Sequence, residues 1–171
     1  ELVVLVTLVR VYIRQNNLEK ALESLQQVLP LLKTYDFEGA APEVHAWHAY
    51  VLAGLGKRED ALKILTQVTE QPPQWPHIKV RTLLAQGQAH IQLIQPEPAS
   101  ELLQEALQMA ESNGFRYYQL IAHHHLSQVV IDQNAQARHA RVAKALARSL
   151  AANLGPEDSK NFLKRGWGEA S

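Results

Sequence analysis

A short motif of small and large residues recurs along the chain at nearly constant spacing. Ala21-Leu22-x-x-Leu25-x-x-Val28 returns 40 residues later as Ala61-Leu62-x-x-Leu65-x-x-Val68, and after a further 38 as Ala99-Ser100-x-x-Leu103-x-x-Ala106. A weaker fourth copy places Ala137 or Ala140 at the first position. A unit this short cannot bury its own apolar surface, so neighbouring copies must stack on one another. The repetition therefore predicts an array of similar units.

The apolar period within each unit is that of a helix. Residues such as Leu18, Ala21, Leu25, Val28 and Leu32 step by three and four along one face, and no long stretch alternates with the period of a strand. A turn such as Gly56-Lys57-Arg58 precedes each copy of the motif, so the unit is a helix, a tight turn and a second helix. The pattern predicts main helices near residues 2–15, 18–34, 43–54, 58–71, 76–94, 98–112, 116–132 and 136–153, with a short helix after Pro156.

Composition limits the kinds of function. Hydrophobic residues make up 46% of the 171 positions, so a folded chain is expected, and 17 basic residues balance 17 acidic ones. This balance disfavours nucleic acid as a partner. There is no cysteine, which excludes disulfides and thiolate chemistry and fits a reducing, cytoplasmic setting. The apolar run from Leu2 to Val9 is too short to span a membrane.

The small and large positions resemble those of the tetratricopeptide repeat family. The matching residues are Leu5, Leu8, Tyr12, Ala21 and Leu25 in the first copy, Ala49, Leu52, Gly56, Ala61, Leu65 and Pro73 in the second, and Leu83, Gly87, Ala99, Leu103 and Ala106 in the third. Asn16 and Ile94 replace the turn glycine, and the period exceeds the usual 34 residues. The longer period resembles that of repeat arrays in large bacterial regulators.

This resemblance implies an all-α fold. We expect a right-handed superhelical solenoid of about four antiparallel helix pairs over residues 1–155, with repeats near 2–41, 42–79, 80–117 and 118–155. Residues 156–171 would form a C-terminal capping segment and tail, in which Trp167 is either docked or disordered. Because residue 1 is Glu, the chain is expected to be part of a longer protein.

The resemblance also implies a binding groove along the first helix of each pair. Carrying the family's groove positions onto this chain gives Arg10, Arg14, Tyr50, Arg81, Gln88 and Gln92 as candidates to contact a protein or peptide partner. The Lys and Asn that members of the family use to clamp a terminal carboxylate are absent, because those positions hold Val6, Ala46 and Leu84 and then Arg10, Tyr50 and Gln88.

No residue pattern points to catalysis, a metal or a cofactor. The serines lie within or at the ends of expected helices, and the glycines are scattered singly and form no phosphate loop. His123, His124 and His125 are consecutive and fan out around a helix, so they cannot share one tetrahedral ion. The histidines are instead expected to pack between helices.

The expected function is a non-catalytic scaffold or sensor module that binds protein or peptide within a larger bacterial signalling or regulatory protein. Two alternatives stay open: a repeat domain that senses a small ligand, and a self-association module that pairs through the apolar N-terminal helix. The stripe of Arg138, Arg141, Lys144 and Arg148 is either a solvated helix face or a contact for an acidic partner.

Overall fold

The computed structural model describes residues 2–34, 39–70 and 72–167, and within these every regular element is a helix. They are α1 (Leu2–Arg14), α2 (Leu18–Thr34), α3 (Ala41–Gly54), α4 (Arg58–Glu70), α5 (Pro76–Gln92), α6 (Pro96–Ser112), α7 (Arg116–Val129), α8 (Gln133–Ala151) and α9 (Pro156–Leu163). The predicted all-α class is confirmed. No helix in these ranges is both long and apolar enough to cross a bilayer.

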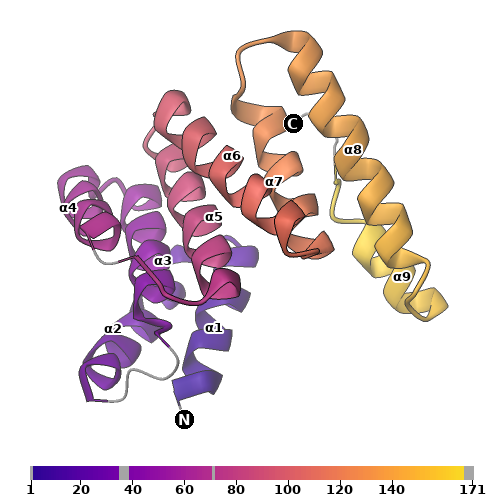
Figure 1. The fold of residues 1–171 in the computed structure, drawn as a ribbon. Coiled ribbons are helices and arrows are strands. Elements are labelled where there is room, and N and C mark those ends of the chain that lie inside the picture. The colour runs from indigo at the N-terminus through magenta and orange to yellow at the C-terminus, as the bar shows by residue number, and fades with distance from the viewer. Residues whose placement is uncertain (1, 35–38, 71, 168–171) are drawn as a thin grey trace.

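Helices pack mainly on their neighbours in the chain. The most extensive packing joins α5 to α6, α7 to α8 and α3 to α5, and contacts nearly as extensive join α1 to α2, α6 to α7 and α3 to α4. The pairs follow one another across the molecule in chain order, from α1 and α2 at one end to α8 and α9 at the other (Figure 1). The alternate helices α3, α5 and α7 are consequently neighbours.

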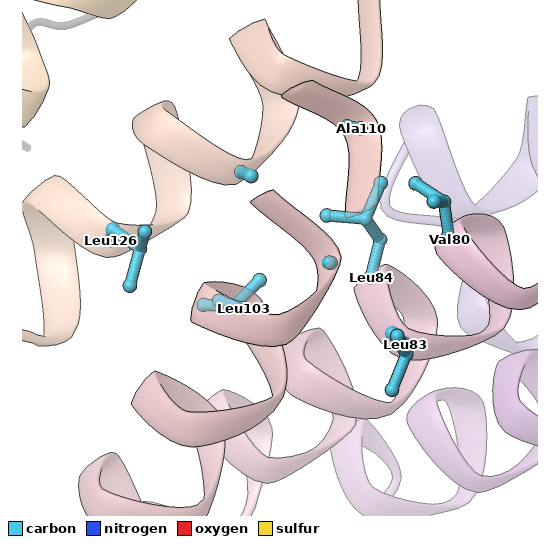
Figure 2. Close-up of a cluster of buried hydrophobic side chains, with 8 residues drawn as sticks. Val80, Leu83, Leu84, Leu103, Ala110 and Leu126 are labelled. Carbon is cyan, nitrogen blue, oxygen red and sulfur yellow. The ribbon is translucent and has the colours of Figure 1, made fainter. Parts of the chain in front are cut away.

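The alanines of the recurring motif lie in the interfaces between helices. Ala21, Ala61 and Ala99 are fully buried, and the leucine four residues later is buried in each copy. Gly87 of α5 serves the same purpose, because a Cβ there would stand 2.8 Å from Leu103 Cγ. Figure 2 shows Leu84 of α5, Leu103 of α6 and Leu126 of α7 within one such cluster, which draws residues from three consecutive helices.

Helix boundaries follow local chemistry, and three starts differ from the prediction, the first being that of α3 at Ala41 instead of residue 43. Helix α6 begins at Pro96 instead of residue 98, since a first helical residue needs no N–H donor. Helix α8 begins at Gln133 instead of residue 136, because the Asp132 side chain accepts hydrogen bonds from the backbone N–H groups of Asn134 and Ala135, at 3.0 and 3.3 Å. Helix α7 ends at Val129, three residues earlier than expected.

The turns that close the first helix of a pair adopt a left-handed backbone. Asn16 has φ 53°, Gly56 has φ 77° and Ile94 has φ 56°. Glycine and asparagine tolerate this region, whereas a β-branched residue is strained in it. The Ile94 side chain is 87% exposed, so packing does not offset the strain.

Replacing Ile94 with glycine should therefore stabilise the protein. We expect Ile94→Gly to raise the free energy of unfolding by about 1 kcal/mol, because glycine removes the clash of Cβ in a left-handed conformation. Urea unfolding monitored by circular dichroism measures the change. Ile131→Gly is the control, since Ile131 is also exposed (82%) and is not among the left-handed residues. A loss of stability in Ile94→Gly would contradict the strain.

Candidate functional site: an arginine- and aromatic-lined hollow

A hollow of about 760 Å³ lies along the alternate helices of the array. Helices α1, α3, α5 and α7 each contribute side chains, and the segment after α9 closes one end. The lining residues are Arg10, Ile13, Arg14, Glu43, Trp47, Tyr50, Arg81, Leu84, Gln88, Tyr117, Tyr118, Ile121, His124, His125, Arg165 and Trp167. Most of these side chains are half-buried and Arg14 and Arg165 are exposed, so the hollow is open to solvent.

Most of the candidate binding residues named from the sequence meet in this hollow. Arg10, Arg14, Tyr50, Arg81 and Gln88 line it, although they come from three separate helices. Gln92 lies outside the lining and donates a hydrogen bond from Nε2 to Tyr50 Oη at 3.2 Å. The structure therefore brings five of the six candidates together.

Glu43 lines the hollow and is only 2% exposed. Its Oε1 lies 2.8 Å from Arg10 Nη2 of α1 and accepts a hydrogen bond from Trp47 Nε1 at 3.2 Å. Its Oε2 lies 2.6 Å from Arg81 Nη2 of α5, as an ion pair without the geometry of a hydrogen bond. The carboxylate thus joins the first helices of three successive pairs, and we call Arg10, Glu43 and Arg81 the ion triad.

Burial governs the electrostatics of the ion triad. Loss of water raises the pKa of the Glu43 carboxyl, while the positive charge of Arg10 and the hydrogen bond from Trp47 act in the opposite direction. A buried carboxylate is retained only where cations and donors replace its hydration. Glu43 neutralises one charge of the two arginines, so the ion triad keeps a net positive charge.

Aromatic rings make up much of the remaining wall. Trp47 and Tyr50 pack edge to face with ring centres 5.7 Å apart, and Tyr117 and Tyr118 lie 5.9 Å apart on α7. Reasoning from the sequence missed the residues of α7, because the groove positions were carried over for the first three repeats only. The helix predicted near residues 116–132 was the signal that could have found them.

Trp167 is docked, which decides between the two alternatives left open by the sequence. Its Nε1 donates to the Phe162 carbonyl at 3.0 Å, and its ring lies edge to face against His124 with centres 5.4 Å apart. Gly166, with φ 69°, provides the turn that brings the ring back from α9 to α7. Arg165 and Trp167 thereby join a hollow made otherwise by α1, α3, α5 and α7.

The histidines of α7 are neutral packing groups at pH 7. His123 and His139 join α7 to α8 through a contact of 2.8 Å between their Nδ1 atoms. Burial, with His139 and Arg138 nearby, lowers the pKa of His123 to about 4, and burial lowers the pKa of His125 to about 4 as well. The positive charge of the hollow at neutral pH therefore comes from its arginines.

The described residues offer no metal site, and the basic stripe lies apart from the hollow. Among the residues that the structure describes, no group of three or more His, Cys, Asp or Glu side chains could hold a metal ion. Arg138, Arg141, Lys144 and Arg148 are all exposed on α8, and none forms an ion pair in the described ranges. This basic stripe lies outside the lining of the hollow.

Comparison with known proteins gives no relative: no family model, no curated protein and no solved structure matches this chain.

Removing the central carboxylate should destabilise the array. We expect Glu43→Ala to lower the free energy of unfolding by about 2 kcal/mol, less than for a fully buried pair because the two arginines are partly exposed. Chemical unfolding measures the loss. The matched control replaces the whole ion triad by apolar residues (Arg10→Met, Glu43→Leu, Arg81→Met) and should recover most of it. A Glu43→Ala protein as stable as the wild type would show that the ion triad does not hold these helices together.

The histidine contact should make the α7–α8 pair sensitive to acid. A histidine whose pKa is lower in the folded state stabilises the fold fully above its unfolded pKa of 6.5, and this stability is lost as the pH falls toward about 4. We expect the free energy of unfolding to fall between pH 6.5 and pH 4, and His123→Gln to reduce this fall. Unfolding curves at several pH values check this, and an equal fall in both proteins would contradict it.

Proposed function

We propose that this chain is a non-catalytic binding module of the tetratricopeptide-repeat type that holds a protein or peptide segment in the hollow along its alternate helices. The supporting observation is that residues from four different helices converge on one open surface. Binding surfaces of helical repeat arrays are built in this way, because each repeat adds one helix to a continuous inner face. An array of this kind would serve as a scaffold or sensor module of a larger bacterial regulatory protein, within the cytoplasm.

The chemistry of the wall supports a peptide as the ligand. Tyrosine, tryptophan and arginine are the side chains that contribute most to protein interfaces, because they combine a large contact area with directed hydrogen bonds. All three types line the hollow. The open mouth accommodates a chain that enters and leaves, as a segment of a longer partner requires.

Two specific observations favour the alternative functions. The volume of about 760 Å³ lies within the range of small-molecule sites, which favours the sensing of a small ligand. Val3 and Val4 of α1 are 69% and 62% exposed, and Leu8 and Val11 extend the same apolar face, which favours self-association through α1. We prefer the peptide to a small ligand because the hollow has an open mouth and draws on four helices. We prefer it to self-association because the exposed face of α1 formed by Val3, Val4, Leu8 and Val11 is apolar.

Selection from a random peptide library tests the proposal. The immobilised wild-type chain should enrich peptides, and the variant with Tyr50→Ala and Gln88→Ala should lose most of this binding, because both side chains line the hollow. The control variant carries Gln104→Ala and Gln108→Ala on the exposed face of α6 and should bind as the wild type does. Thermal unfolding confirms that each variant is folded. Equal recovery by the folded hollow variant would place binding elsewhere.

A further inference from the structure

The hollow carries an excess of positive charge that the whole chain does not have. The sequence has 17 basic and 17 acidic residues, yet the hollow is lined by four arginines and by a single carboxylate, that of Glu43. With the histidines of its wall neutral, the lining has a net charge of three positive units. A concentration of one sign within a neutral molecule indicates a ligand of the opposite sign.

The arginines of the ion triad have N–H donors that do not contact Glu43. A guanidinium group has five N–H donors. In each of Arg10 and Arg81 the contact to Glu43 is made by Nη2, and the two side chains are 31% and 24% exposed. Glu43 thus fixes the position of both groups without consuming their capacity to bind an anion. A cation that is already held in place loses little entropy when an anion binds to it.

Two more arginines stand on the rim of the hollow. Arg14 of α1 and Arg165 of the C-terminal segment are exposed and line it, and neither forms an ion pair among the described residues. The four cations therefore come from α1, α5 and the C-terminal segment, and Arg10 and Arg81 among them flank the same carboxylate. Several carboxylates along an extended segment could pair with cations of all three elements.

Rings line the space between these cations. Trp47 and Tyr50 come from α3, Tyr117 and Tyr118 from α7, and Trp167 from the C-terminal segment. Half-buried rings offer apolar area at small entropic cost and accept aromatic or aliphatic side chains. The hollow thus combines anion-binding groups with an apolar wall.

We propose that the hollow binds an acidic peptide segment that lies within the chain of a partner and not at its end. The Asp or Glu carboxylates of this segment meet Arg10, Arg14, Arg81 and Arg165, and one of its apolar or aromatic side chains packs against the rings. This inference rests on the proposed function and names the chemistry of its ligand. A peptide is favoured over a single-stranded nucleic acid because the chain as a whole is neutral and the basic stripe of α8 does not extend into the lining of the hollow.

The same peptide selection also tests this chemistry, when the recovered peptides are sequenced and their amino-acid composition is compared with that of the library. Peptides displayed with both ends blocked should be enriched in Asp and Glu after selection on the wild-type chain. A selected peptide should then bind at least about tenfold more weakly when its carboxylates are replaced by amides, and about tenfold more weakly to the variant with Arg14→Gln and Arg165→Gln. Both arginines are exposed and lie outside the ion triad, so this variant keeps the fold.

A variant with Arg141→Gln and Arg148→Gln provides the matched control. It removes two exposed arginines from the basic stripe of α8, outside the hollow, and should bind the acidic peptide as the wild type does. Tighter binding of a single-stranded oligonucleotide than of the selected peptide would overturn the proposed ligand.

The remaining outcomes separate the two proposals. Selected peptides without acidic enrichment that still require Tyr50 and Gln88 would overturn the acidic ligand and leave the proposed function in place. Recovery of no peptide by the folded wild-type chain would overturn both.

Discussion

The architecture depends on close approach between helices at small residues. Ala21, Ala61 and Ala99 are fully buried, and a leucine four residues later fills the space beside each contact. Dispersion and apolar burial act only where surfaces fit closely, so a larger side chain at the alanine positions would separate the helices. Since each pair packs mainly on the next, this small contact, repeated along the chain, sets the spacing of the alternate helices that line the hollow.

Glu43 shows how an apolar array acquires a polar centre. A carboxylate that is 2% exposed is costly unless cations and donors surround it, and here two arginines and an indole N–H do so from three sides. Arg10 and Arg81 are 71 positions apart in the chain, and they meet because the pairs stack in register. The ion triad is thus a product of the fold that supplies part of the positive charge of the hollow, beside Arg14 and Arg165.

The repeating positions made much of the fold predictable. The periodicity of Leu18 to Leu32 and the recurrence at Ala61 and Ala99 were enough to predict the helices. The groove positions implied by the family resemblance selected Arg10, Arg14, Tyr50, Arg81 and Gln88, which line one hollow. The burial of Glu43 could not be read in this way, because a charged residue is normally exposed and its partners lie on other helices.

The C-terminal side of the hollow could not be predicted from the sequence, for a different reason. Trp167 reaches the hollow through a chain reversal at Gly166 that no repeat specifies. Likewise, the earlier start of α8 depends on the side chain of Asp132, which lies outside the apolar period. A repeat pattern predicts the structure that the units share. It does not predict the contacts of single residues that break the pattern.

The ion triad also has a mechanical consequence. In a stack where units touch mainly their neighbours, bending is resisted by few forces. A carboxylate paired with arginines of the preceding and the following pair acts as a brace across the first three pairs. In the described ranges the ion pairs end at α6, and α7 is held to α5 and α6 by apolar packing and by the hydrogen bond from Gln119 Nε2 to the Ala110 carbonyl. The hollow therefore has one side braced by charge and another held by apolar contact.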